Sequence, residues 1–157
     1  MRTHAQEASC IMAHPNYEVF DFGVTRRWLA DDHIALITTD GHMNTPAINT
    51  WADLVIDTIN LFPPDQPIAI CQDLIGPHQG FTAEVRDRLA DIYAHLPVDQ
   101  VVYSTIALNN GMIRNMVKVY LRRRKFQHDH LHEYVAADVE SGLDWLHQKL
   151  DQHYASV

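Results

Sequence analysis

One stretch, residues 100–125 (QVVYSTIALNNGMIRNMVKVYLRRRK), constrains the fold most strongly. Its first part, 101–108, is nearly all apolar or β-branched, which is typical of a strand covered on at least one face. The turn residues Asn109, Asn110 and Gly111 follow. Apolar residues then recur at three- and four-residue steps, which predicts an amphipathic helix. The helix positions predicted to face inward are Ile113, Met116, Val117, Tyr120 and Leu121.

The rest of the chain shows the same alternation of predicted strands and helices. Other runs rich in β-forming residues predict strands at 17–22, 25–30, 33–39, 67–74 and 130–137. Helices are predicted to begin after capping side chains, which are Asn44, Thr82, and either Asp138 or Ser141. The short Asp31-Asp32 connection favours an antiparallel hairpin between the second and third strands.

This order of elements predicts an α/β fold. Three strands come first, and the later strands alternate with helices, so right-handed crossovers between parallel strands are expected. The sequence therefore predicts a single mixed β-sheet that is mostly parallel and has an antiparallel N-terminal hairpin. The domain should cover residues 17–157, with residues 1–16 as an N-terminal extension.

The composition restricts the classes of protein to consider. The formal net charge is -8, so the surface as a whole should repel nucleic acid, and no nucleic-acid partner is expected. Cys10 and Cys71 lie far apart and form no disulfide framework, which fits a reducing compartment. The sequence has no signal-peptide core and no run of the roughly 20 apolar residues that span a membrane. A cytoplasmic protein without integral membrane insertion is expected.

Three segments together are similar to a known family. They are ALITTDGHMNTPAINTWADLV, the stretch 100–125, and DVESGLDWL at 138–146. In this order, over about residues 25–150, the chain resembles the STAS domains (sulfate transporter and anti-sigma-factor antagonist), and more closely their stand-alone SpoIIAA-like branch. The resemblance implies a mixed sheet with four helices mainly on one face and usually no enzyme activity. It also implies binding to protein partners, and sometimes to nucleotides or lipids.

The chain departs from this family at the site of regulation. Anti-sigma antagonists are phosphorylated on a serine within an Asp-Ser motif at the start of the second helix. The matching loop here, QDLIGPHQGFTAEV, offers only Thr82 at the helix start, and no Asp-Ser precedes it. Thr82 is therefore the remaining candidate for phosphorylation. A phosphate there would be favoured by the helix dipole, but capping alone also explains a threonine at this position.

Polar residues gather in the loops that follow the predicted parallel strands. Ligands of open α/β sheets bind beyond the carboxyl ends of the strands, so these loops are a candidate site for a small ligand or anion. The candidate residues are Asp40, His42, Asn44, Asp73, His78, Asn109, Asn110, Gly111 and Arg114. The alternative is ordinary turn chemistry, in which asparagine, aspartate and glycine serve the backbone.

An enzyme would need an assembled catalytic site. Asp73 with His78, or Asp40 with His42, could act as acid–base pairs, but neighbouring polar residues in a loop are common. Neither a phosphate-binding loop motif nor a nucleophile motif is present. No cofactor and no catalytic residue are therefore predicted.

Two further clusters have a functional and a structural interpretation. His128, His130 and His132 would share one face of a strand, where three imidazoles could bind a metal ion; solvated histidines before an edge strand are the alternative. The run Arg122, Arg123, Arg124 and Lys125 complements the negative end of a helix dipole, and it could also contact an acidic protein or an anionic membrane surface.

The function that the sequence favours is a non-catalytic regulatory or protein-interaction module, STAS-like and present as a homodimer. A small-ligand or anion-binding protein, or an enzyme, that uses the strand-end loops is the alternative. A concave pocket around Asp40, Asp73 and Asn110 would favour the second hypothesis.

Overall fold

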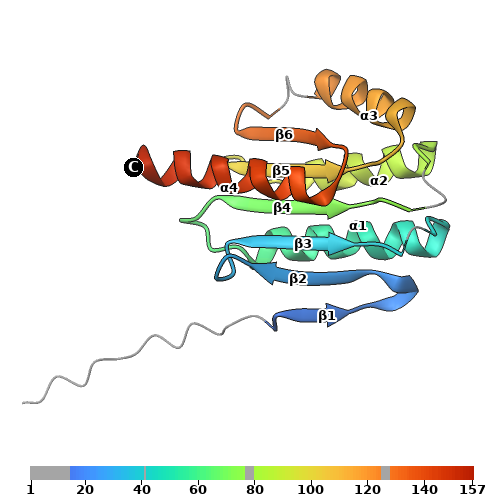
Figure 1. The fold of residues 1–157 in the computed structure, drawn as a ribbon, viewed down its shortest axis with the longest axis horizontal. Coiled ribbons are helices and arrows are strands. Elements are labelled where there is room, and N and C mark those ends of the chain that lie inside the picture. Colours follow the sequence, from blue (N-terminus) through green and yellow to red (C-terminus); the bar gives the residue numbers. More distant parts are fainter. Residues whose placement is uncertain (1–14, 41, 77–79, 125–127) are drawn as a thin grey trace, which may run out of the picture.

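The computed structural model describes residues 15–40, 42–76, 80–124 and 128–157. They form one six-stranded sheet with the strands in sequential order, β1-β2-β3-β4-β5-β6 (Figure 1). The strands are β1 (Tyr17–Val19), β2 (Thr25–Leu29), β3 (Ile34–Thr38), β4 (Ile68–Asp73), β5 (Val102–Ala107) and β6 (Leu131–Ala136). The pairs β1–β2 and β2–β3 are antiparallel, and the other three pairs are parallel. The predicted α/β class and mixed sheet are confirmed.

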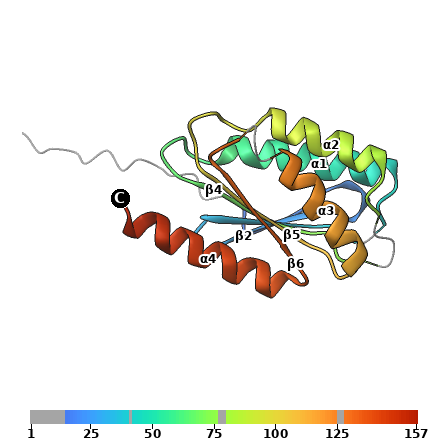
Figure 2. The same cartoon turned by 90° about the horizontal axis from the view of Figure 1, so that it is seen from above.

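The helices lie in two layers. They are α1 (Thr45–Leu61), α2 (Ala83–Ala94), α3 (Gly111–Arg124) and α4 (Val139–Ala155). Helices α1, α2 and α3 each connect neighbouring parallel strands, and they cover the same face of the sheet because such crossovers share one hand. Helix α4 follows the last strand, so no crossover constrains it, and it packs on the opposite face (Figure 2).

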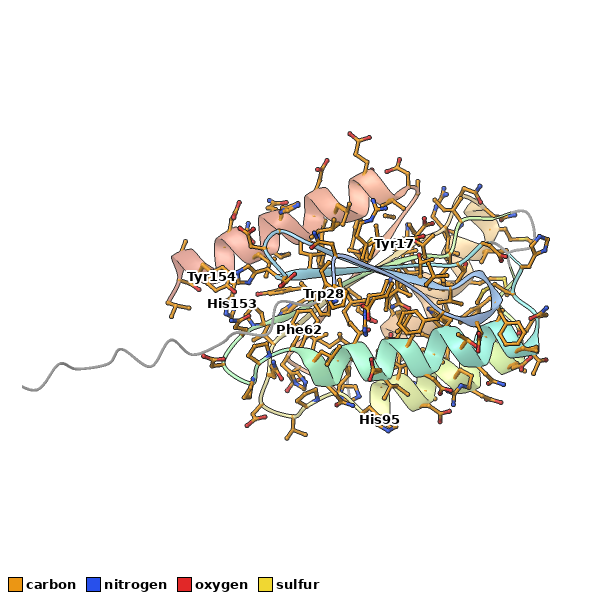
Figure 3. The ribbon with its side chains drawn as sticks, turned by 90° about the horizontal axis from the view of Figure 1, so that it is seen from below. Tyr17, Trp28, Phe62, His95, His153 and Tyr154 are labelled. Atoms are coloured by element: carbon orange, nitrogen blue, oxygen red, sulfur yellow. The ribbon has the colours of Figure 1, made fainter. Side chains whose placement is uncertain are left out.

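Each layer has its own apolar core. The larger core lies between the sheet and α1, α2 and α3, and includes Trp51, Val85 and Val117. The tilted ring pair Trp28–Phe62, with 5.4 Å between ring centres, joins β2 to the C-terminal end of α1 (Figure 3). The smaller core lies under α4. It is formed by Ile34, Ala69, Cys71, Tyr103, Leu146 and Leu150.

The predicted helix starts are confirmed by hydrogen bonds. Asn44 Oδ1 accepts from the Ala47 amide at 3.1 Å, and Thr82 Oγ1 accepts from the Val85 amide at 3.3 Å. Of the two candidates for α4, Asp138 is the cap, because its Oδ1 accepts from the amide of Ser141 at 2.7 Å. These bonds satisfy amides that have no partner inside the helix.

The N-terminal hairpins require left-handed backbone. Asp31 and Asp32 form the predicted turn between β2 and β3, and both have positive φ, which aspartate tolerates better than most residues. The first strand was predicted over 17–22 but ends at Val19. A short 3-10 turn, η1 (Asp21–Gly23), follows it. A Cβ atom on Gly23 (φ 71°) would collide with the Asp40 carboxylate, so both the backbone conformation and the space favour glycine there.

Helix α4 approaches the sheet closely at Gly142. A Cβ atom on Gly142 would lie 3.1 Å from Thr105 Oγ1 and 3.5 Å from Cys71 Sγ. Cys71 is fully buried there, and burial raises the pKa of its thiol from 9.0 to about 11.

Among the described residues, no helix is both long and apolar enough to cross a membrane.

Candidate functional site: a groove between helices α2 and α3

The strand-end loops lie side by side, as predicted. Thr38, Asp73 and Ala107 are register partners at the ends of β3, β4 and β5, so the three following loops meet at one edge of the sheet. Their polar side chains bind nearby backbone. Asp40 Oδ1 accepts from the His42 amide at 3.0 Å, and Asp73 Oδ1 accepts from the Ile75 amide at 3.1 Å. Burial raises the pKa of Asp73, while the bond from Ile75 opposes the shift.

The third loop uses its polar groups in the same way. Asn110 Oδ1 accepts from the amides of Met112 and Ile113 at 3.0 and 3.2 Å, at the first turn of α3. Arg114 Nη1 donates to the carbonyls of Leu108 and Asn109 at 2.9 and 3.0 Å. Gly111 is the first residue of α3, and His78 lies outside the described residues. The ligand site in these loops stays a prediction, and the observed bonds are those of turns and caps.

The structure brings together two of the three histidines that were predicted to share one face: the rings of His128 and His130 pack edge to face with 6.0 Å between their centres, and His132 lies apart from them. Strand β6 begins at Leu131, so the two-residue alternation of a strand does not extend to His128 and His130. His128 stacks on Tyr93 of α2, with 6.0 Å between ring centres. His132 stacks on Tyr103, in the core under α4, with ring centres 5.4 Å apart. Within the ranges that the structure describes, no three potential ligands are placed to hold a metal ion.

Tyr93 belongs to a partly buried polar pair that the sequence did not indicate. Its hydroxyl donates to Glu133 Oε1 of β6, and burial raises the pKa of Tyr93 well above its ordinary value, helped by the charge of Glu133. The signal in the sequence is weak, because an isolated glutamate in a strand is more often exposed. The pair joins α2 to the last strand.

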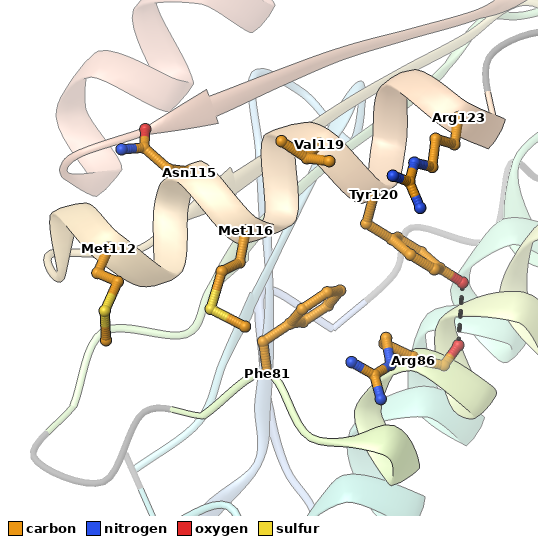
Figure 4. A pocket seen from close by; sticks show the side chains of 8 residues that line it. All are labelled: Phe81, Arg86, Met112, Asn115, Met116, Val119, Tyr120 and Arg123. Atoms are coloured by element: carbon orange, nitrogen blue, oxygen red, sulfur yellow. Dashed lines mark hydrogen bonds between the residues drawn. The ribbon is translucent and has the colours of Figure 1, made fainter.

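A groove of about 910 Å³ lies between α3 and the start of α2 (Figure 4). We call it the α2–α3 groove. It is lined by Phe81, Arg86, Met112, Asn115, Met116, Val119, Tyr120 and Arg123. Phe81 and Tyr120 pack edge to face with 5.3 Å between ring centres, and the Tyr120 hydroxyl donates to the Arg86 carbonyl at 3.2 Å. These contacts hold the two walls together.

Helix α3 carries two apolar stripes. Ile113, Val117 and Leu121 form the inner one and are buried, as predicted. Met116 was predicted to face inward, but 45% of it is exposed. With Met112, which is 70% exposed, and Val119, which is 49% exposed, it forms the outer stripe. The outer stripe follows helical spacing and forms the floor of the α2–α3 groove. The sequence pattern indicates that some apolar positions of α3 stay exposed, since they outnumber those that one face can bury, but it does not say which.

Cations flank the groove and the end of α3. Arg122, Arg123 and Arg124 lie in the last turn of the helix, as predicted, and Lys125 lies outside the described residues. In the described part of the chain, the ion pairs involve Arg26 and Arg88 and none of these three arginines. The guanidinium carbon of Arg86 lies 5.9 Å from the ring centre of Phe81, and that of Arg124 lies 5.5 Å from the ring centre of Tyr120. The groove is therefore apolar in its floor and positive at its edges.

Comparison of the chain with protein-family models, with curated proteins and with solved structures finds no match in any of the three. The functional assignment of the α2–α3 groove therefore rests on its own geometry and charge.

Proposed function

We propose that the protein is a non-catalytic, STAS-like interaction module that binds a partner protein in the α2–α3 groove. The element order and the mixed sheet agree with what the resemblance to STAS domains implies, which supports the proposal. The cytoplasmic location and the regulatory role expected from the sequence belong to the same proposal.

The observation that carries the proposal is the exposed outer stripe of α3. Met112, Met116 and Val119 are neighbours on one helix face, and Phe81 extends the apolar surface across to α2. Contiguous apolar surface of this kind marks interaction sites in soluble proteins. Methionine suits such a role because its flexible, polarizable side chain adapts to the shape of a partner.

A selection experiment tests whether the groove binds polypeptides. A random peptide library is displayed and selected on the full chain, and each enriched peptide is then tested on the double variant Met116→Asp/Val119→Asp. We expect binding to be lost, because two carboxylates in the apolar floor would have to be desolvated. Val98→Asp is the matched control, since Val98 is 88% exposed and lies outside the groove. A selection in which no enriched peptide distinguishes the double variant from the control would contradict the proposal.

Self-association is part of the sequence-based expectation and stays a prediction. Light scattering on the full chain measures it directly, and a dimer that persists in the Met116→Asp/Val119→Asp variant would place the contact away from the α2–α3 groove.

The prediction of phosphorylation on Thr82 also stays open to test. Thr82 is exposed and its hydroxyl caps α2.

A further inference from the structure

We propose that the occupant of the α2–α3 groove is an amphipathic helix of the partner protein, with carboxylates on both sides of its apolar stripe. This inference rests on the proposed function, because it names the partner segment for the same groove.

The length and shape of the groove fit a short helix. The α3 residues that line it run from Met112 to Arg123, which at 1.5 Å per residue is about 16 Å, or about three helical turns. Phe81 stands on the opposite side, in the segment that enters α2 (Figure 4). An apolar groove of this length matches helix-in-groove recognition, in which residues at i, i+3, i+4 and i+7 are the anchors.

The charges at the edges select an acidic helix. Arg86 stands on the α2 side and Arg123 on the α3 side, and neither has a carboxylate partner among the described residues. A docked helix would remove water from both guanidinium groups, so carboxylates opposite them are needed to offset that loss. A glutamate on each flank of the apolar stripe would meet one arginine.

A second copy of this chain fits the groove poorly. Helix α3 has five cations, Arg114, Lys118, Arg122, Arg123 and Arg124, and no carboxylate. In a two-fold pair the same surface meets itself. An antiparallel pair of α3 helices would place the arginines of each copy against the positive N-terminal end of the other. The chain as a whole has 20 acidic against 12 basic residues, so the positive charge of this helix is a local feature.

A flat anionic membrane is the other surface that attracts arginines beside apolar side chains. The bond from Tyr120 to the Arg86 carbonyl joins α3 to α2, and the apolar side chains line a groove between the two helices. A helix can contact Phe81 and Met116 inside the groove, whereas a planar surface meets mainly the more exposed Met112 and Val119. We therefore choose the helix and make the membrane an outcome of the test.

The experiment uses the peptides that the full chain enriches from the random library. We expect them to show apolar residues at three- and four-residue spacing, flanked by Asp or Glu. Their affinity for the wild-type chain should fall as salt is added, because the edge pairs are screened. Charge reversal in Arg86→Glu/Arg123→Glu should weaken binding by at least about tenfold. Arg27→Glu is the control, since Arg27 is an exposed arginine outside the groove.

A rescue completes the test and shows that the charge-reversed variant is folded. Peptides in which Lys replaces the flanking Glu should bind Arg86→Glu/Arg123→Glu more tightly than they bind the wild-type chain. Enriched peptides that need Met116 and Val119 but are neutral, basic or without helical periodicity would overturn the acidic helix and leave the proposed function standing. Binding to phosphatidylcholine–phosphatidylserine vesicles that both double variants abolish, with no groove-dependent peptide, would overturn both.

Discussion

Arg26 of β2 and Glu18 of β1 form a two-bond ion pair across the first hairpin. Arg26 Nε donates to Glu18 Oε2 at 2.8 Å, and Nη2 donates to Oε1 at 3.0 Å. Its third nitrogen, Nη1, reaches Asp57 and Thr58 of α1 at 2.9 and 3.0 Å. Burial alone would lower the pKa of Arg26, but the hydrogen bonds to Glu18 and Asp57 raise it overall. One guanidinium group therefore joins the edge strand, its neighbour and the first helix.

Replacing this arginine should destabilise the fold. In Arg26→Ala, Glu18 loses its partner and the stem of Arg26 leaves a gap beside Phe20 and Trp28, whose ring centres lie 5.4 and 5.7 Å from the guanidinium carbon. We expect a loss of about 3 kcal/mol in the free energy of unfolding, measured by urea titration. Arg27→Ala removes an exposed arginine from the next position and should cost less than about 0.5 kcal/mol. Equal losses would contradict the structural role of Arg26.

A methyl group at position 142 should also be costly. Alanine favours a helix over glycine by about 1 kcal/mol, but its Cβ would press on Thr105 Oγ1 at 3.1 Å, and Thr105 is fully buried in a central strand. We expect Gly142→Ala to lower the free energy of unfolding by about 1 kcal/mol, because overpacking outweighs propensity. In a Thr105→Ala background the penalty should disappear, which a double-mutant cycle would show. A stabilised Gly142→Ala protein would mean that Thr105 can move aside.

The order of the elements was predictable because it depends on local signals. Asn44 and Thr82 cap helices as predicted, and Asp138 is one of the two candidates predicted for the last helix, since an amide at a helix start needs an acceptor whatever the tertiary structure is. The alternation of strands and helices favours parallel pairing, and with the strands in sequential order the right-handed crossovers put α1, α2 and α3 on one face. The place of α4 on the opposite face depends on the packing of Gly142, Leu146 and Leu150 on the sheet, and no sequence period says which face of the sheet a final helix covers.

The groove was not predictable in the same way. Met116 and Val117 are adjacent apolar residues on α3, yet only Val117 is buried. The three- and four-residue pattern says that a helix has an apolar side, but it cannot say which of two neighbouring stripes meets the sheet. The loop residues show the same limit of sequence patterns, and the ligand site proposed there stays a prediction. Asp73 and Asn110 have the chemistry of a binding site, but in the structure they accept bonds from nearby amides.

Substitutions in the floor of the groove should affect binding and leave the fold intact. Met116 and Val119 lie on the outer stripe of α3, so Met116→Asp and Val119→Asp bury no new charge in the free protein. We expect the free energy of unfolding to change by less than about 0.5 kcal/mol in each variant. Val117→Asp, one position from Met116 but buried, should unfold the protein or cost more than about 3 kcal/mol. Similar losses at 116 and 117 would mean that the outer stripe is covered in solution.

The buried thiol of Cys71 should make the fold sensitive to alkali. Its pKa is about 11 in the folded protein and 9.0 when the thiol is unperturbed, so above pH 9 the unfolded chain releases a proton that the folded chain keeps. The stability that this neutral thiol contributes is complete below that pH and is lost as the pH rises toward 11. By about pH 11 the wild-type protein should have lost about 2 kcal/mol more than Cys71→Ala.

Urea titrations of both proteins at a series of pH values measure this difference. Comparing the two isolates Cys71 from the tyrosines, because Tyr93 and Tyr103 have raised pKa values in both proteins and lower the alkaline stability of both. The difference in the free energy of unfolding between the wild type and Cys71→Ala should be constant below about pH 8 and fall above it. Parallel curves across the whole range would show that the thiol ionises as readily in the folded protein as in the unfolded one. The contact between Gly142 of α4 and Cys71 of β4 would then have to open to water.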